Sequence, residues 1–173
     1  MDRITLVTGG SRGIGAATAR LCAAEGHAVA VNYCNDAEAA TNVCAAVEAA
    51  GARAFPVRAD TGNEDDILAM FEAVDRELGP VTGLVNNAGI HGPRGRLDAL
   101  SAGDIARVLD VNVSGYFLCA REAVRRMSTR HGGNGGAIVN VSSGSAKLGG
   151  PNEGVLYAAS KGAVNSLTIG LSQ

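Results

Sequence analysis

The chain has 173 residues and a formal net charge of -2, with 46% of its residues apolar and 18% charged. This length is enough for a domain with a core of its own. The composition argues against a disordered chain and against a nucleic-acid partner held by electrostatics. No apolar run approaches the length of a membrane span, and no signal peptide precedes the first apolar run. We therefore expect no nucleic-acid partner, no membrane partner and a cytoplasmic location.

The cysteines and histidines do not form a pattern typical of disulfides or of a metal site. They are scattered along the chain at Cys22, Cys34, Cys44, Cys119, His27, His91 and His131. Cysteines without a Cys-x-x-Cys pair or an adjacent histidine are typical of free thiols in a reducing compartment. The histidines lie in glycine-flanked turns, which favours exposed loop residues, and we expect no metal site.

Short apolar runs alternate with segments of helical spacing along the whole chain. Strands are predicted at Ile4–Val7, Val29–Val31, Ala54–Val57, Val81–Val85 and Ala137–Val141. Helices are predicted at Ile14–Glu25, Ala37–Ala50, Asn63–Leu78 and about Ser101–Met127, and a last helix from near Tyr157. Strands that are apolar throughout and separated by helices indicate a parallel sheet covered on both faces.

Right-handed crossovers and a glycine loop after the first strand favour the strand order 3-2-1-4-5. The predicted fold is a doubly wound α/β (Rossmann) sheet, with residues 1–173 forming one dinucleotide-binding domain. Pro56, which cannot donate to a strand ladder, suits an edge strand.

The segment from Thr8 to Gly15, Thr-Gly-Gly-Ser-Arg-Gly-Ile-Gly, has the features of a phosphate-binding loop. Gly9 would allow the tight exit from the strand, Gly13 the approach of a pyrophosphate, and Gly15 close helix–strand packing. The helix N-terminus would offer free N–H groups to the phosphates. The spacing is Gly-x-x-x-Gly-x-Gly rather than the commoner Gly-x-Gly-x-x-Gly, so an ordinary glycine turn is the alternative. The candidate cofactor residues here are Gly9, Ser11, Arg12, Gly13, Ile14 and Gly15.

The end of the second predicted strand carries the information on cofactor preference. NAD-preferring sites usually place a carboxylate there to hold the ribose. This chain instead has Asn32 and Tyr33, while Arg12 could pair with a 2′-phosphate. NADP is therefore favoured, with Asn32 and Tyr33 as candidate ribose contacts. NAD remains the alternative, because Arg12 could be merely solvated and Asp36 lies nearby.

Polar residues at the ends of the third and fourth strands are further candidates. Asp60 could accept a hydrogen bond from the adenine amino group or, equally, cap a helix, and Thr61 follows it. The segment Asn86-Asn87-Ala88-Gly89 is interpreted first as backbone scaffolding and second as a cofactor contact. Thr61, Asn87, Ala88 and Gly89 complete this group of candidates.

Asn112 lies inside an otherwise apolar helical stretch. Asparagine is a poor residue for a helix interior, because its side chain competes for backbone hydrogen bonds. Asn112 is therefore predicted to mark a kink or a polar function.

Tyr157 and Lys161 lie four residues apart, which places a phenol and an ammonium on one helix face. A free tyrosine has a pKa of about 10, too high for efficient proton exchange at neutral pH. A neighbouring ammonium and an oxidised nicotinamide would both lower that pKa. Ser143, at a strand end, could hydrogen-bond a substrate oxygen. A surface Tyr–Lys pair is the alternative explanation.

The motifs in this order and spacing resemble the short-chain dehydrogenase/reductase family, most closely its 3-oxoacyl-carrier-protein reductase and sugar-dehydrogenase branches. The resemblance implies an NAD(P)(H)-dependent interconversion of a ketone and a secondary alcohol. It also implies Tyr157 as general acid/base, Lys161 as its electrostatic partner and ribose anchor, and Ser143 as carbonyl polariser. Asn112 would hold a relay water. The family further implies a homotetramer and a small-molecule carbonyl or alcohol substrate.

Two departures from the family pattern stand out. Ser143 lies one residue farther from Tyr157 than is common, so Ser145 is a second candidate for the serine. Family members also continue beyond the Tyr/Lys helix into further strands, which this sequence does not include, so we expect those C-terminal strands to be missing. Two functions follow as expectations: an active oxidoreductase, or a fragment that binds the dinucleotide without turnover.

Overall fold

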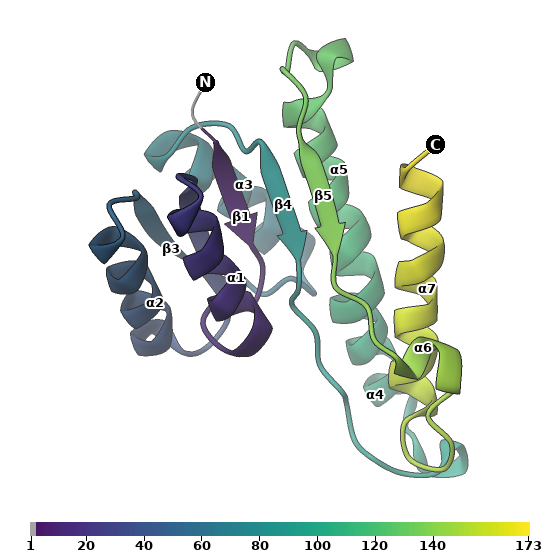
Figure 1. Ribbon diagram of the computed structural model, residues 1–173. Helices are drawn as coiled ribbons and strands as arrows, with labels where there is room; N and C mark the ends of the chain where they lie inside the picture. Colours follow the sequence, from purple (N-terminus) through teal and green to yellow (C-terminus); the bar gives the residue numbers. More distant parts are fainter. Residues whose placement is uncertain (1–2) are drawn as a thin grey trace.

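Five parallel strands form the sheet that organises the molecule (Figure 1). The computed structural model describes residues 3–173. The strands are β1 (Ile4–Val7), β2 (Ala28–Tyr33), β3 (Ala54–Arg58), β4 (Gly83–Asn86) and β5 (Ala137–Asn140). Their order is β3-β2-β1-β4-β5 and every pairing is parallel, which confirms the predicted fold class and strand order.

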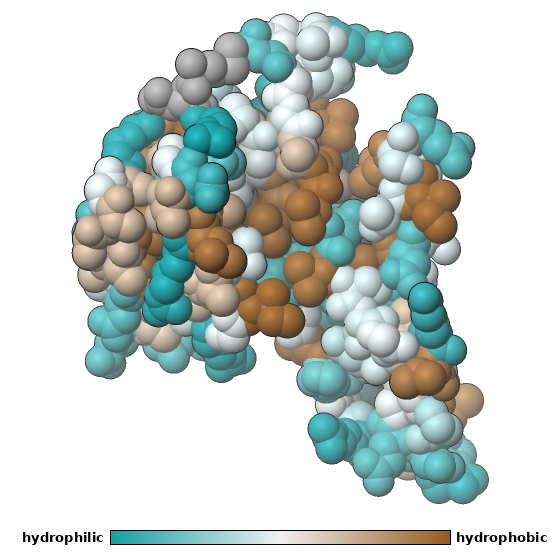
Figure 2. All heavy atoms as spheres, viewed as in Figure 1, coloured by the Kyte–Doolittle hydropathy of each residue, from teal (hydrophilic) through white to brown (hydrophobic). Residues whose placement is uncertain are grey.

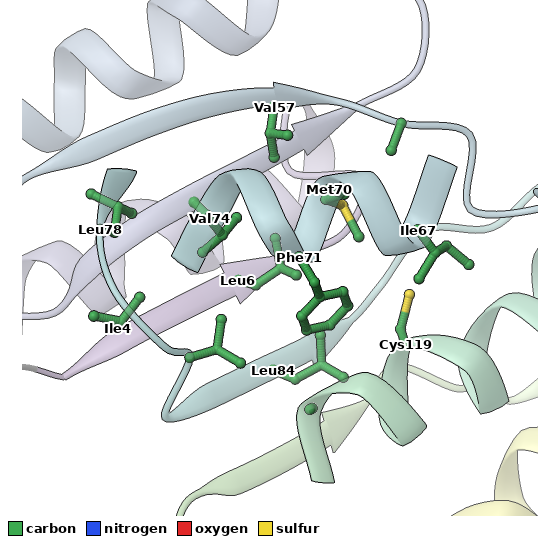
Figure 3. Close-up of a cluster of buried hydrophobic side chains, with 14 of the residues drawn as sticks. Ile4, Leu6, Val57, Ile67, Met70, Phe71, Val74, Leu78, Leu84 and Cys119 are labelled. Carbon is green, nitrogen blue, oxygen red and sulfur yellow. The ribbon is translucent and has the colours of Figure 1, made fainter. Parts of the chain in front are cut away.

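Helices pack against both faces of the central strands. The α-helices of residues 3–173 are α1 (Gly13–Ala24), α2 (Ala37–Ala49), α3 (Glu64–Glu77), α4 (Ala102–Leu109), α5 (Gly115–Met127), α6 (Ser145–Leu148) and α7 (Val155–Leu171). Of these, α1, α2, α3 and α5 cover the central strands. One core cluster joins β1 and β4 to α3 and α5, and Phe71 and Leu6 are fully buried within it (Figure 3). A second cluster joins β1 and β2 to α1 and α2 on the opposite face. Burial of these apolar side chains is the main favourable term for folding.

The edge strand β3 contains Pro56, as the sequence predicted. At the other side of the described sheet, β5 is covered less completely. Val139 is 54% exposed, and Figure 2 shows apolar side chains gathered in a hollow between α1 and the α6–α7 region. The prediction that helices cover both faces of the sheet is confirmed for the central strands. It does not hold for β5, because the helices of one face, α1 and α2, pack over β1 and β2 and do not extend to β5.

The long helix predicted over about Ser101–Met127 is interrupted. Regular α-helix ends at Leu109, a π-helical turn covers Asp110–Ser114, and α5 follows. Asn112 lies in the middle of this turn and is fully buried, so the predicted kink is confirmed at this residue. Single π-helical turns of this kind are frequent at functional sites.

The remaining differences from the prediction are three short elements and the start of the last helix. The short helix α6 and the 3-10 turns at Leu97–Ala99 and Thr129–His131 were not predicted, and α7 begins at Val155 rather than near Tyr157. Within residues 3–173, no helix has both the length and the hydrophobicity needed to cross a bilayer.

Candidate functional site

The carboxyl ends of the parallel strands all meet at one edge of the sheet, and a groove of about 590 Å³ lies there. It is formed by the glycine loop after β1, the ends of β2 and β3, the segment after β4, and α4. Its lining includes Gly9, Ser11, Arg12, Gly13, Ile14, Tyr33, Asp36, Asp60, Thr61, Asn87, Gly89, His91 and Arg107. The crevice outside the carboxyl ends of such a sheet is where ligands of doubly wound folds bind.

The glycine loop has the geometry that a phosphate site requires. Gly9 has a φ of +60°, a backbone conformation that residues other than glycine rarely adopt. A side chain on Gly15 would collide with the carbonyl oxygen of Gly9, so only glycine fits between α1 and the loop. α1 begins at Gly13 without a side-chain cap, which leaves its first N–H groups directed at the groove. The residues therefore fit a dinucleotide phosphate.

Asn32 does not take the position predicted for it. Its side chain is 1% exposed and does not line the groove. Its Oδ1 accepts the Gly9 N–H at 3.0 Å, and its Nδ2 donates to the carbonyl oxygens of Val57 and Ala59 at 3.3 and 3.1 Å. The amide thus ties the glycine loop to β3, whereas Tyr33 lines the groove.

Asn87 serves the scaffold, as its first interpretation held. Its Nδ2 donates to the carbonyl oxygens of Thr8 and Gly9 at 2.9 and 3.1 Å. The Thr8 hydroxyl accepts the N–H groups of Asn87 and Ala88 at 2.9 and 3.0 Å. These bonds lock the segment after β4 against the glycine loop, which brings Gly89 to the groove.

Asp60 is paired with Arg107, which was not among the residues predicted from the sequence. The guanidinium of Arg107 on α4 approaches its Oδ1 at 3.1 Å and its Oδ2 at 2.9 Å. Asp60 does not cap α3, because the Asn63 side chain accepts the capping N–H of Asp66. Of the two alternatives for Asp60, the helix cap is therefore wrong, whereas its carboxylate does line the groove next to the buried Thr61.

The buried amide of Asn112 connects the π-helical turn to two other segments. Its Oδ1 accepts the Ile90 N–H at 2.8 Å, and its Nδ2 donates to the Ile90 carbonyl at 2.8 Å and to the Ser160 hydroxyl at 3.0 Å. This clamp holds the segment after β4 against α7, and a side chain on Gly89 would approach both Asn112 Oδ1 and Lys161 Nζ.

Lys161 is 3% exposed and its ammonium points to the end of β5. Its Nζ donates to the Val141 carbonyl at 2.8 Å and to the Tyr116 hydroxyl at 3.0 Å. Burial lowers the pKa of Lys161 from 10.5 to about 8. Nζ also lies over the ring of Tyr157, 6.0 Å from its centroid, and within residues 3–173 no hydrogen bond joins the two side chains.

Tyr157 lies half-buried at the start of α7, next to the groove. Its ring stacks on the imidazole of His91, with ring centroids 4.1 Å apart and an interplanar angle of 28°. Ser143 lies two residues beyond Val141, and its Oγ accepts the N–H of Ser145 at 3.2 Å. Tyr157, Lys161 and Asn112 thus gather around the segment after β4, while Ser143 and Ser145 share the turn that enters α6.

Tyr116, His91 and Arg107 are the side chains of this region that sequence reasoning missed. Each contacts a predicted residue from a different part of the chain: Tyr116 with Lys161, His91 with Tyr157, and Arg107 with Asp60. The spacing of His91 after Gly89 offered a signal, because a residue so close to a predicted groove segment is well placed to face it.

Comparison with known proteins agrees with this geometry. A family model described as "short chain dehydrogenase" matches residues 3–173, and the chain belongs to this family. YgfF of Escherichia coli (strain K12), an uncharacterized oxidoreductase, is 55% identical over 169 residues, which are 98% of this chain and 68% of that protein.

Two solved structures extend the comparison. A blue fluorescent protein from a metagenomic library, in complex with NADPH, is 37% identical with a TM-score of 0.90; the match covers 98% of this chain and 67% of that one. An NAD+-bound xylitol dehydrogenase is 36% identical with a TM-score of 0.88; the match covers 98% of this chain and 63% of that one. The chain therefore spans about two thirds of the length of these proteins.

Proposed function

We propose that this protein is an NADP(H)-dependent oxidoreductase that interconverts a ketone and a secondary alcohol. The observation that carries the proposal is the single groove that joins the open N-terminus of α1 to His91, the residue stacked on Tyr157. Bound NADPH would supply the hydride. Tyr157 would donate the proton to the carbonyl oxygen, and Ser143 would hydrogen-bond that oxygen.

NADP rather than NAD is proposed on the strength of Arg12. Its side chain lines the groove next to the end of β2, where no carboxylate is placed by the strand itself. Asp36 lines the same groove, but its Oδ1 accepts the N–H of Ala39 at 2.9 Å and so caps α2. A guanidinium suits a 2′-phosphate, whereas a carboxylate used as a cap is less available to a ribose.

A second candidate function is dinucleotide binding without turnover. The observation that favours it is the open face of β5, where Val139 is 54% exposed, because catalysis of this kind benefits from a site that excludes water. Within residues 3–173, no side-chain or turn hydrogen bond joins the glycine loop to β5, so cofactor binding could persist without turnover.

We also propose a homo-oligomer built through α5, where Phe117 is 52% exposed.

One experiment separates the two functions. The 173-residue chain is assayed for NADPH oxidation with a panel of ketones, alongside fluorescence titration of NADPH. Turnover that falls by orders of magnitude in Tyr157→Phe, with unchanged NADPH affinity, supports the enzyme. Tight NADPH binding without turnover supports the second function, and near-normal turnover in Tyr157→Phe contradicts the role of the phenol.

A further inference from the structure

Tyr116 forms a closed triangle of hydrogen bonds with Lys161 and the end of β5. It lies in the first turn of α5, directly after the π-helical turn, and is 2% exposed. Its hydroxyl donates to the Val141 carbonyl at 3.0 Å and accepts from Lys161 Nζ at 3.0 Å. The ammonium completes the triangle by donating to the same carbonyl at 2.8 Å.

The ring of Tyr116 also lies closer to the ammonium than the ring of Tyr157 does. Lys161 Nζ is 4.7 Å from the Tyr116 ring centroid, compared with 6.0 Å for Tyr157. Cations within about 6 Å of an aromatic face are attracted to it. Tyr116 therefore holds the ammonium through both its hydroxyl and its ring.

The contact with Tyr116 matters because the ammonium of Lys161 is buried. A buried ammonium must be compensated by hydrogen bonds or by a charge. In the part of the chain that the structure describes, no carboxylate forms an ion pair with Lys161. The polar groups that face it are the two phenols, the Val141 carbonyl and, across Gly89, the amide of Asn112.

Tyr116 is suited to stay neutral in this role. Burial raises the pKa of its phenol well above the ordinary value, and the nearby Tyr157 phenol adds to that rise. A neutral hydroxyl can donate to the carbonyl and accept from the ammonium at once, which a phenolate cannot. These two bonds use two of the three ammonium donors.

We propose that Tyr116 is the positioning residue for Lys161: its hydroxyl and ring hold the ammonium at the end of β5, beside the segment that lines the cofactor groove. The consequence for catalysis rests on the proposed function, whereas the contact itself does not. A purely structural alternative exists, in which the Tyr116 hydroxyl only fastens α5 to β5 and has no influence on the ammonium.

The chain offers an unusually direct test, because it contains only two lysines, Lys147 and Lys161. Protein labelled with 13C at lysine Cε gives two NMR signals, and their pH midpoints are followed in wild type and in Tyr116→Phe. Loss of a hydrogen bond to the charged form is expected to lower the Lys161 midpoint by about one pH unit. The exposed Lys147 is the internal reference and is expected not to move.

Ser142→Ala is the matched control. The Ser142 hydroxyl donates to the main-chain carbonyl of Lys161 at 3.1 Å, so this variant removes a hydroxyl bonded to the same residue without touching the ammonium. An unchanged Lys161 midpoint in Tyr116→Phe overturns the proposal. An equal shift in Ser142→Ala also overturns it, because the effect would then be general loosening.

Turnover supplies the second readout. In Tyr116→Phe the alkaline limb of the kcat profile is expected to move to lower pH together with the NMR midpoint. At pH 7, kcat is expected to fall about 2-fold, because a midpoint that moves from about 8 to about 7 lowers the protonated fraction of Lys161 from about nine tenths to about half. If wild type shows no turnover with any ketone while the NMR shift is present, the proposed function fails and the positioning role stands. A shifted NMR midpoint with an unmoved profile overturns the catalytic consequence of the proposal.

Discussion

The imidazole of His91 stacks on the ring of Tyr157, with centroids 4.1 Å apart, although the two residues come from different segments. His91 lies in the segment after β4 and lines the groove, whereas Tyr157 is in the first turn of α7. The stack places the ring of Tyr157 against a residue that lines the groove. An aromatic pair of this kind is worth about 0.5–1.5 kcal/mol beyond the area it buries.

His91→Ala is therefore expected to lower kcat about 2- to 10-fold, because the phenol loses the ring that orients it. His91→Phe keeps an aromatic ring and should restore most of the activity. NADPH affinity, measured by fluorescence titration, should change little in either variant. Equal losses in the alanine and phenylalanine variants would show that the imidazole acts through its nitrogens instead.

Lys161 is expected to make folding stability depend on pH. Its pKa in the folded chain is about 8, below the ordinary 10.5, so the unfolded chain binds more protons between these values and stability rises with pH across that window. The cost of the buried charge is fully present below pH 8 and amounts to about 3 kcal/mol at most.

Lys161→Met, which removes the charge, should be more stable than wild type at pH 7 in urea unfolding. The stability difference between the two proteins should shrink by about 3 kcal/mol at most from pH 8 to pH 10.5. Lys147→Met, at an exposed site, is the control and should show no such trend. A stability difference that does not vary with pH would contradict the lowered pKa.

Arg12 is expected to determine the preference for NADPH over NADH. Arg12→Ala should weaken NADPH binding about 10-fold, because a charge-assisted contact to the 2′-phosphate is lost, and should leave NADH binding nearly unchanged. Arg20→Ala removes the same charge from an exposed position of α1 that does not line the groove. If the two variants weaken NADPH equally, general electrostatic attraction explains the preference.

The choice between Ser143 and Ser145 can be made by single substitutions. The Ser143 oxygen accepts the N–H of Ser145 at 3.2 Å, which orients the side chain and leaves its O–H free to donate to a substrate. Ser143→Ala is therefore expected to reduce kcat by about 100-fold, the usual cost of losing one such donor. Ser145→Ala should stay near wild type, and the reverse ranking of the two variants would assign the role to Ser145.

Much of the fold could be predicted because local and global signals agree in this chain. Pro56 indicated an edge strand, and β3 is at the edge of the sheet. Asn112 indicated an irregular helix because its amide competes with the backbone, and the π-helical turn lies there. The short helix α6 was not foreseen, since four residues carry too little periodicity to be recognised.

The candidate site was harder to predict, because side-chain partners depend on how distant segments meet. Asn32 occupies a strand end, where a ribose contact is common, but its amide is directed inward to Gly9 and β3. Lys161 lies one helical turn from Tyr157 in the sequence, yet its ammonium bonds to Tyr116 from another helix. Sequence spacing along one helix predicts which face a side chain lies on. It does not predict which group from another element will form a hydrogen bond with that side chain.

The π-helical turn at Asp110–Ser114 has a consequence for the evolution of this chain. A π-helical turn holds one residue more than the α-helical turn it replaces, so a single deletion there would restore regular α-helix and leave the orientation of Tyr116, Cys119 and Ala123 unchanged. The same deletion would displace Asn112 and remove the hydrogen bonds it forms with Ile90. A deletion inside α5, where each residue rotates the next by about 100°, should instead disrupt the core.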